Sequence, residues 1–474
     1  MTQSAHLATQ PAADPHSGPT PQSGLTAASE SRPPVCKVAY VMSRFPKLTE
    51  TFVLFEMLAV EQQRVQVEIF PLLGKASSGK EVAGAGIWRK FRDHFRAPTQ
   101  PAVMHAEAQP CVARARYMPF INRAILLANG GMAVRHPLRY LITLGVIIRE
   151  NFGNANFLFG ALTVFPKCVY FGRCMQREGV QHVHAHFANH PAAAAYIIHR
   201  LTGIPYSFTA HGSDLHRHQQ MLAEKVDKAN FVVTVSQYNR DVIRKHSGQR
   251  SADKIQVIHC GVDVDKFRPG TARSDSPDSL QIICVGTLHE VKGQQYLLRA
   301  VGLLRRRGLA CQVHFVGDGP DRAMLEDVVR EESLQSQVTF HGTQTRDQLI
   351  ERFRAADVLV TPSVPTSDGR REGIPVVLME GMACGLPVVA SRLSGIPELV
   401  NSDRVGRLCE PKDVADLAAA IEEFAHDPAL RQRVGQQARQ RIMQEFSLAG
   451  NAEKLLALFQ RSASSNSQPE ANQR

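Results

Sequence analysis

Two series of short apolar strands, each alternating with amphipathic helical stretches, run through the chain, one after Cys36 and one after Ser279. Such alternation is typical of parallel sheets that carry helices on both faces. Between the series lies a polar segment rich in Pro, Gly and Ser, residues 268–279, with the composition of an interdomain linker. A length of 474 residues also exceeds what one hydrophobic core usually supports. We therefore predict two α/β domains, each built on a parallel sheet.

The predicted domain organisation places these two domains between polar ends. The first end is rich in Ser, Pro, Thr, Ala and Gln and lacks the pattern of a secretory signal, so we expect disorder there. The predicted segments are a tail (1–34), a first domain (35–267), a linker (268–279), a second domain (280–445), a C-terminal helix returning to the first domain (446–462) and a tail (463–474). The predicted strands are 37–41, 65–70, 182–184, 206–209, 231–235, 281–285, 312–316, 337–340, 358–361 and 387–390.

Positive charge is concentrated in one part of the chain. The net charge is +11, and residues 75–180 hold 15 Lys and Arg against 5 Asp and Glu. Within 75–177, basic and aromatic stretches such as Trp88–Arg96 and Arg135–Tyr140 stand beside apolar residues 141–148. This combination suits an anionic membrane surface, and the alternative is a basic helical excursion packed on the first domain with solvated charge.

Several classes of protein do not fit the composition. No recognised basic-aromatic binding motif accompanies the charge, so we predict no nucleic-acid partner. The apolar runs fall short of the roughly 20 residues that cross a bilayer. The nine cysteines are scattered without a CxxC pair, which favours a reducing compartment over zinc or redox chemistry.

The strongest motif places two carboxylates, Glu372 and Glu380, eight positions apart across a Gly and a Pro. The proline suits the first turn of a helix, where its missing N–H costs nothing. Unpaired N–H groups at such a helix entrance can hold a phosphate. The alternative is an ordinary helix with one capping and one solvated acid. The residues that form the entrance are Gly373, Ile374, Pro375, Val376 and Val377.

This motif resembles the Glu, seven residues, Glu signature of the family-4 glycosyltransferases, and the resemblance covers nearly all of residues 36–459. It implies a retaining enzyme of the GT-B architecture, in which two Rossmann-like parallel-sheet domains face a cleft. It also implies that Glu372 lies beside the donor sugar and reaction centre and that Glu380 binds the ribose hydroxyls. No cofactor is expected beyond the nucleotide-sugar donor, with a UDP-sugar favoured and a GDP-sugar as the alternative.

Further donor contacts are predicted after two strands of the second domain. Gly286, Thr287 and Lys292 follow the first strand, where a lysine can neutralise a departing diphosphate; a solvated lysine is the alternative. The resembled family usually has an arginine where Thr287 stands, so one expected contact is missing. Gly317 and Gly319 form a turn that either contacts the donor or serves only the turn.

Histidines are prominent in the first domain. His211 begins a His-Gly-Ser-Asp sequence that matches the cleft histidine of the resembled family, which implies a hydrogen bond to the donor sugar. Nearby, His182, His184 and His186 alternate like one face of a strand, a pattern that could suggest a metal site. We favour strand-end packing and cleft lining for these three.

An Asp-x-Asp sequence at Asp263 and Asp265 is similar to the metal site of transferases with another architecture. It stands just before the linker and matches a structural turn of the resembled family. We therefore predict no catalytic metal.

The acceptor side is expected after the first strand. Many relatives have a glycine pair there, whereas residues 43–52 resemble an exopolysaccharide (colanic-acid-type) subgroup. Arg44, Lys47 and Glu50 are the candidate acceptor contacts. The alternative is a plain helix entry, with Thr49 as the cap and Phe52 in the core.

Together with these features, the family resemblance implies a retaining, metal-independent glycosyltransferase that moves a sugar from a nucleotide-sugar to a lipid-linked saccharide in cell-surface polysaccharide biosynthesis. We expect it in the cytoplasm, peripheral on the inner face of the membrane; the sequence does not predict its oligomeric state. One alternative is a GT-B epimerase or hydrolase that acts on the nucleotide sugar without an acceptor. The other is an inactive GT-B scaffold at the membrane surface.

Overall fold

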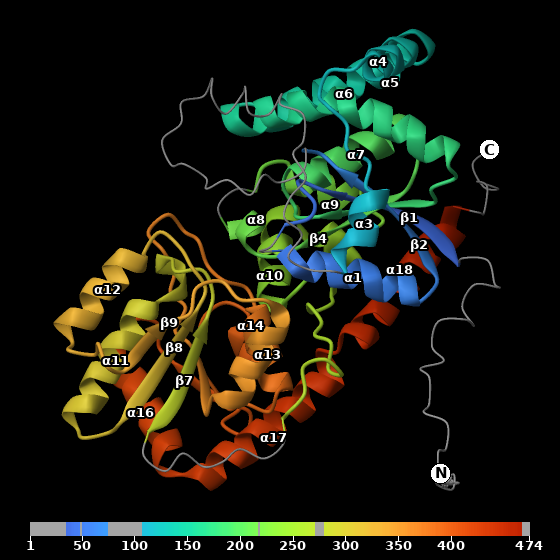
Figure 1. The fold of residues 1–474 in the computed structure, drawn as a ribbon. Helices are drawn as coiled ribbons and strands as arrows, with labels where there is room; N and C mark the ends of the chain where they lie inside the picture. Colours follow the sequence, from blue (N-terminus) through green and yellow to red (C-terminus); the bar gives the residue numbers. More distant parts are fainter. Residues whose placement is uncertain (1–34, 48–49, 74–106, 217–218, 271–278, 467–474) are drawn as a thin grey trace, which may run out of the picture. The chain divides into compact units, whose positions relative to one another are not determined.

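The computed structural model describes residues 35–47, 50–73, 107–216, 219–270 and 279–466 (Figure 1). Several sequence-based predictions lie outside these residues. They are the N-terminal tail 1–34, Thr49 as a helix cap, the basic stretch Trp88–Arg96, linker residues 271–278 and the end of the C-terminal tail, 467–474.

The first α/β domain is built on a six-stranded parallel sheet in the order β2-β1-β3-β4-β5-β6. The five strands predicted in this half are confirmed, and the sixth, β6, is a three-residue edge strand that periodicity did not detect. One face packs against α6 (Ala155–Arg177) and α7, and the other against α1 and the C-terminal helix α18 (Leu448–Asn466). The strands are β1 (Cys36–Met42), β2 (Val65–Pro71), β3 (His182–His186), β4 (Tyr206–Ala210), β5 (Phe231–Thr234) and β6 (Ile255–Val257). The helices are α1 (Thr51–Gln62), α7 (His190–Thr202), α8 (Ser213–His216), α9 (Leu222–Lys228), α10 (Gln237–Ser247) and the 3₁₀ turn η2 (Gln249–Lys254).

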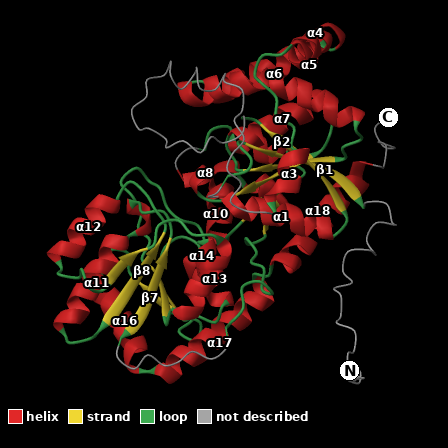
Figure 2. Ribbon diagram, in the orientation of Figure 1, coloured by secondary structure: helices red, strands yellow, loops and turns green. Residues whose placement is uncertain are grey.

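The second domain repeats this plan with the order β12-β11-β10-β7-β8-β9, again all parallel. Figure 2 shows the strands of this sheet with helices around them. Separate apolar clusters cover its two faces, one with α13, α14 and α17 and one with α11, α12 and α16. The two predicted parallel-sheet domains are thus confirmed. The strands are β7 (Leu280–Val285), β8 (Cys311–Val316), β9 (Val338–Phe340), β10 (Val358–Thr361), β11 (Val388–Ser391) and β12 (Arg407–Cys409). The helices are η3 (Glu290–Lys292), α11 (Gln294–Arg306), α12 (Arg322–Glu331), α13 (Arg346–Ala355), α14 (Val376–Ala383), α15 (Ile396–Leu399), α16 (Val414–His426) and α17 (Pro428–Glu445).

The C-terminal helix α18 spans Leu448–Asn466 and packs against α1, β1 and β3 of the first domain. It is longer than predicted, because residues 463–466, which we expected in a disordered tail, continue the helix. The apolar face of α18 is buried, and Ser462 near its end hydrogen-bonds His182 at 3.0 Å. These contacts stabilise the last turns, which polar composition alone did not indicate.

In the described part of the basic middle segment, residues 107–177, helices pack on the first domain, and α4 and α5 lie against α6 (Figure 1). Part of its charge is internal: buried Lys167 donates to the carbonyls of Leu72 and Met118 at 2.6 and 2.7 Å, and burial lowers its pKa to about 8. Within the described residues, no helix is both long and apolar enough to cross a membrane. The helices are α3 (Ala108–Arg114), α4 (Arg123–Arg135), α5 (Pro137–Asn151) and α6 (Ala155–Arg177).

Candidate active site

Lys292 and Glu372 form an ion pair beyond the carboxyl ends of the second sheet. Lys292 Nζ lies 2.6 Å from Glu372 Oε1, and the Ser363 hydroxyl donates to Glu372 Oε2 at 2.8 Å. The two charged side chains keep 18% and 16% of their area exposed, so both can reach a ligand. Ligands of open α/β sheets bind at this edge. The structure thus brings together two residues that the sequence assigned to the donor.

Glycines pack the neighbouring turns closely around Lys292. A Cβ on Gly286 would lie 3.0 Å from Lys292 Cε. A Cβ on Gly317 would lie 2.1 Å from the Gly286 carbonyl oxygen, and one on Gly319 would lie 2.3 Å from the Leu288 oxygen. These contacts support the turn-packing interpretation of Gly317 and Gly319, and their contact with a donor stays a prediction.

Thr287 stands exposed in the same loop, and its carbonyl accepts a hydrogen bond from Gln294 at 3.0 Å. Its short side chain carries no charge where the resembled family has an arginine. Arg370 approaches this loop from the Glu372 segment, with Nη1 3.3 Å from His289 Nε2. A guanidinium is therefore present near the loop although it comes from a different position in the sequence.

The helix entrance after Glu372 begins one residue later than predicted. Pro375 is the residue before α14 and has an extended ψ of 126°, and its carbonyl accepts from Leu378 N at 3.1 Å. The predicted entrance residues Ile374 and Val376 flank it, with Ile374 buried and Val376 half-buried. Gly373 faces the first domain, where a Cβ would lie 2.9 Å from the His211 carbonyl oxygen. A glycine at this position therefore lets the Glu372 loop approach His211.

Glu380 lies inside α14 and is half-buried. Burial raises the pKa of Glu380 to about 7, and the Arg346 guanidinium from α13 offsets part of this effect. A carboxyl group with such a pKa changes its charge near neutral pH. Any ligand hydroxyl that it binds is therefore bound in a pH-dependent way.

His211 follows β4 in a loop that Asp214 fixes. The Asp214 carboxylate accepts from the backbone N–H groups of Ala188, His211 and Gly212 at 2.6, 3.1 and 2.7 Å. The His211 ring contacts the rings of both Phe52 and Phe187, with centroid distances of 4.6 and 4.8 Å. Burial and the neighbouring His186 hold the pKa of His211 well below its usual value. The ring is thus neutral at physiological pH.

The alternating histidines of β3 are buried and hydrogen-bonded to hydroxyl groups. His182 and His184 share the Ser207 hydroxyl at 2.7 and 2.8 Å, and His184 also contacts Thr209 Oγ1 at 2.9 Å. Desolvation lowers the pKa of both rings, that of His182 to about 3. This pattern agrees with the strand-packing interpretation of these two residues.

The Asp-x-Asp sequence forms a turn. The Asp263 carboxylate accepts from the backbone N–H groups of Asp265 and Lys266 at 3.1 and 3.0 Å, and the Asp263 carbonyl accepts from Phe267 N at 2.9 Å. The Asp263 carboxylate therefore stabilises a local backbone turn, in agreement with the structural-turn interpretation.

The candidate acceptor residues lie at the entrance to α1. Lys47 pairs with Glu50, and Glu50 precedes α1 without a side-chain capping bond. Arg44 is half-buried two residues beyond β1. Phe52, which the plain helix-entry interpretation placed in the core, is half-buried and contacts the His211 ring. The first turn of α1 is therefore next to the predicted sugar-binding histidine.

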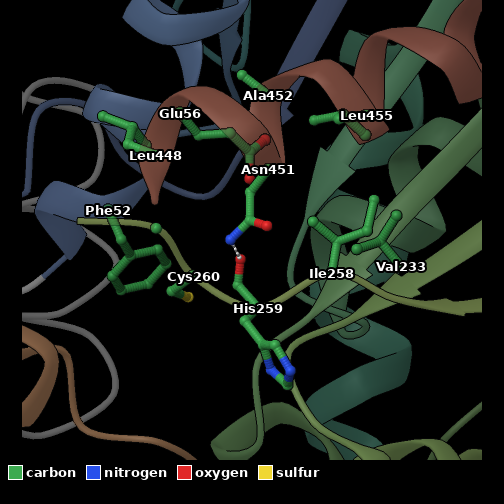
Figure 3. Close-up of a pocket in the computed structure, with 11 residues that line it drawn as sticks. Phe52, Glu56, Val233, Ile258, His259, Cys260, Leu448, Asn451, Ala452 and Leu455 are labelled. Atoms are coloured by element: carbon green, nitrogen blue, oxygen red, sulfur yellow. Dashed lines mark hydrogen bonds between the residues drawn. The ribbon is translucent and has the colours of Figure 1, made fainter. Parts of the chain in front are cut away.

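A small cavity of about 20 Å³ borders this turn of α1 (Figure 3). Its wall includes Phe52, Glu56 and Cys260, together with Asn451 of α18, whose amide donates to the His259 carbonyl at 2.8 Å. A volume of this size holds about one water molecule and is far below the roughly 300 Å³ of a small-molecule site. The cavity is therefore not the donor site.

Gly293, next to Lys292, offers a test of how tightly this loop is built. Gly293 and Gly342 share a φ of +67°, but a Cβ on Gly293 would lie 1.8 Å from the Pro362 carbonyl oxygen, whereas nothing lies within 4 Å at Gly342. We expect Gly342→Ala to cost about 1 kcal/mol for the left-handed backbone. Gly293→Ala should cost about 1–3 kcal/mol more because of the clash. Denaturant unfolding measures both, and equal losses would contradict the close packing.

Sequence reasoning did not identify two residues of the candidate site, Ser363 and Glu56. Ser363 holds Glu372. Glu56 hydrogen-bonds His186, which the sequence had placed at the strand end lining the cleft and which contacts His211. A signal for Glu56 was present, because it is an acid four residues after Phe52 within the apolar stretch of α1. Residues at this spacing share a helix face. Ser363 had no such signal, since it depends on the fold of the loop after β10.

Two family models match the chain. Residues 272–441 match glycosyl transferases group 1, and residues 136–266 match glycosyltransferase family 4, so together they cover more than half of the chain. The first of these matches lies largely on the second domain, and the second begins at α5 in the first domain.

Curated relatives share part of their length with this chain. The putative colanic acid biosynthesis glycosyltransferase WcaL of Escherichia coli K12 is 34% identical over 209 residues, which are 44% of this chain and 51% of that protein. The amylovoran biosynthesis glycosyltransferase AmsK of Erwinia amylovora is 33% identical over 196 residues, 41% of this chain and 48% of that protein. The chain spans about half the length of these relatives.

Solved structures match nearly the whole chain. Sucrose-phosphate synthase from Thermosynechococcus elongatus has a TM-score of 0.62 at 19% identity and covers 91% of this chain and 100% of its own. Anabaena Alr3699/HepE in complex with UDP has a TM-score of 0.62 at 16% identity, and the match covers 89% of this chain and 98% of the Anabaena chain. At these identities the likeness concerns the fold, and it confirms the predicted GT-B architecture.

Proposed function

Because the chain belongs to the group 1 and family 4 glycosyltransferases, we propose that it transfers a sugar from a nucleotide-sugar donor to a saccharide in exopolysaccharide biosynthesis. The relatives WcaL and AmsK, named for colanic acid and amylovoran biosynthesis, support this assignment. The observation that carries it is the arrangement of Lys292, Glu372 and His211. The first two form an ion pair, and Gly373 lets the loop that holds Glu372 approach His211.

In the proposed reaction the donor diphosphate binds between Lys292 and the amino end of α14. Lys292 leaves its ion pair with Glu372 and neutralises the negative charge that grows on the departing diphosphate. Glu372 and His211 hold the sugar as positive charge develops on its ring, and Glu380 accepts the ribose hydroxyls. The Lys292 ammonium and the backbone N–H groups at the amino end of α14 supply positive charge without a metal ion. We therefore propose a metal-independent reaction.

We propose retention of configuration, with the acceptor attacking from the face that the diphosphate leaves and giving its proton to a donor phosphate oxygen. The acceptor is a lipid-linked saccharide that contacts Arg44, Lys47 and Glu50 near the start of α1. UDP is the favoured nucleotide, and complexes of the Anabaena protein with UDP and with UDP-glucose support that choice.

The donor class can be measured by ligand-induced thermal stabilisation with UDP, GDP, ADP and their common sugars, in the presence and absence of EDTA. We expect one nucleotide class to raise the unfolding midpoint without any metal, since binding to the native state alone stabilises it. Stabilisation that disappears with EDTA would contradict the metal-independent mechanism. A protein that no nucleotide stabilises would favour the inactive scaffold.

We further propose that α4 and α5 bind an anionic membrane surface on the inner face of the cytoplasmic membrane. Large apolar side chains are exposed on these helices, among them Val134 at 82%, Leu138 at 74% and Leu141 at 61%. Arg123, Arg135 and Arg139 are exposed on the same two helices. Apolar side chains that enter the bilayer interface, together with arginines that attract anionic headgroups, account for this combination.

Leu138→Ser combined with Leu141→Ser tests this surface. We expect vesicles that contain phosphatidylglycerol to bind this variant about tenfold more weakly, because two side chains no longer enter the interface. Met443→Ser, which alters an exposed apolar side chain of α17, is the control. Vesicle sedimentation measures the binding. Equal sedimentation of the double variant and the control would show that this surface does not bind the membrane.

A further inference from the structure

A chain of buried hydrogen bonds connects His211 to a carboxylate on another element. His211 Nε2 lies 3.0 Å from His186 Nδ1, and His186 Nε2 lies 3.1 Å from Glu56 Oε1. His186 ends β3 and is completely buried, while Glu56 projects from α1 and keeps 25% of its side chain exposed. The Tyr40 hydroxyl also donates to Glu56 Oε1, at 3.2 Å. Residues of α1, β3 and the loop after β4 therefore form one line of hydrogen bonds that ends at the predicted sugar site, and Tyr40 of β1 joins it at Glu56.

These partners assign the proton positions along the chain. A carboxylate only accepts hydrogen bonds, so His186 must carry its proton on Nε2. With that proton placed, His186 Nδ1 can accept a hydrogen bond from His211 Nε2–H. His211 consequently keeps its other ring nitrogen, Nδ1, as an acceptor. Burial favours this neutral state, since it holds the pKa of His211 well below its usual value.

We propose that Glu56 and His186 are positioning residues for the sugar subsite, holding His211 in the tautomer whose Nδ1 accepts a hydrogen bond from a hydroxyl of the bound sugar. This inference rests on the proposed function, because it takes His211 as a donor-sugar ligand. It also gives His211 a definite chemistry. The neutral ring selects a sugar that presents a hydroxyl donor at that point and does not supply a proton to the reaction.

The surroundings of His211 fix the orientation of its ring as well as its tautomer. The rings of Phe52 and Phe187 contact the His211 ring, in addition to its hydrogen bond with His186. Phe187 directly follows His186 and has a φ of +78°, a left-handed backbone that non-glycine residues rarely adopt. Such backbone strain concentrates at functional sites. Its consequence here is that Phe187 contacts His211 from the same short segment that supplies His186.

A metal ion is the competing explanation for this cluster, because ligand atoms of Glu56, His184 and His186 lie within 4.8 Å of one another. The hydrogen bonds argue against it. Both ring nitrogens of His184 are engaged by the hydroxyls of Ser207 and Thr209, and both nitrogens of His186 are engaged by Glu56 and His211. A metal would have to displace one of these partners from each ring. The hydrogen-bonded chain accounts for all four nitrogens without that change.

A double-mutant cycle between Glu56 and His211 tests the proposal through kcat/KM for sugar transfer. We expect Glu56→Met to lower kcat/KM about tenfold, the effect of losing a well-placed hydrogen bond. In a His211→Ala background the same change should cost less than about twofold, because Glu56 acts only through His211. Glu56→Gln keeps a carbonyl oxygen that can accept from His186, so we expect it to restore most of the activity.

Ser207→Ala is the matched control. Ser207 is equally buried in the neighbouring strand and links His182 to His184, a set of contacts that does not include His211. The Ser207→Ala variant should have a lower free energy of unfolding and an unchanged kcat/KM. If Glu56→Met does not fold, His186→Phe replaces it in the cycle, because a phenyl ring makes neither the bond to Glu56 nor the bond to His211.

The outcomes separate the positioning role from the function on which it rests. A loss of activity in Glu56→Met that persists in the His211→Ala background would overturn the positioning role and leave the sugar site in place. An effect of Glu56→Met no larger than that of Ser207→Ala would do the same. A His211→Ala variant with unchanged transfer would overturn the assignment of His211 itself, and with it the inference.

Discussion

Lys292→Ala is expected to lower the rate constant of sugar transfer about 10²–10³-fold, the usual cost of removing one group that stabilises developing negative charge. The protein should remain folded, since a partly exposed ion pair contributes only about 0–1 kcal/mol to stability. Steady-state kinetics with a saturating donor measure the effect. The loss should fall mainly on kcat, because the charge that Lys292 neutralises grows as the diphosphate departs.

Lys37→Ala is a closely matched control for this variant. Lys37 pairs with Glu68 at 3.2 Å, and their side chains are 19% and 16% exposed, compared with 18% and 16% for Lys292 and Glu372. Lys37 lies near the beginning of β1, at the opposite end of a strand from the ligand-binding edge. The two variants should therefore lose similar stability and differ in activity. Equal transfer rates in the two variants would show that Lys292 takes no part in the reaction.

Affinity for a nucleotide sugar is expected to fall about 20-fold when the pH is lowered from 7.5 to 5.5, as Glu380 becomes protonated. The pKa of Glu380 is raised to about 7 by burial, and ribose hydroxyls need the carboxylate as an acceptor. Calorimetric titration at several pH values measures the change. A nucleotide sugar is preferred to the free nucleoside diphosphate, whose terminal phosphate titrates in the same range.

Glu380→Gln provides the control, because its amide does not titrate. Its affinity should be weaker than that of the unaltered protein at pH 7.5 and nearly independent of pH. The free energy of unfolding of the unaltered protein should also depend on pH. A raised carboxyl pKa means that the folded state binds more protons than the unfolded chain between about pH 4.5 and 7, so stability declines as the pH rises through this window. A pH-dependent affinity that persists in Glu380→Gln would assign it to another group.

The sequence predicted the two domains and the parts of the site that depend on local pattern. Strands buried on both faces read as apolar runs, so ten of the twelve were detected from composition and spacing. The two strands that were not predicted, β6 and β12, are edge strands of three residues each. Lys292 and Glu372 were identified from their motifs, although their direct ion pair follows only from the folded loops.

Contacts between distant segments could not be predicted. The approach of Gly373 to His211 joins residues more than 150 positions apart, and the chain from Glu56 to His211 joins α1, β3 and the loop after β4. The extension of α18 beyond residue 462 also depends on the first domain, through the contact between Ser462 and His182. The local sequence does not indicate such partners, because these contacts depend on how the sheet brings the ends of its strands together.

The most direct test of the central proposal is product analysis by mass spectrometry after incubation of the protein with a nucleotide sugar, with and without a lipid-linked saccharide acceptor. We expect nucleoside diphosphate to be released in the presence of acceptor and the sugar to appear on that acceptor in equal amount. Release without acceptor, or conversion of the nucleotide sugar into an isomer, would instead identify a hydrolase or an epimerase. Unchanged donor with every nucleotide sugar and acceptor would contradict a transferase and favour the scaffold.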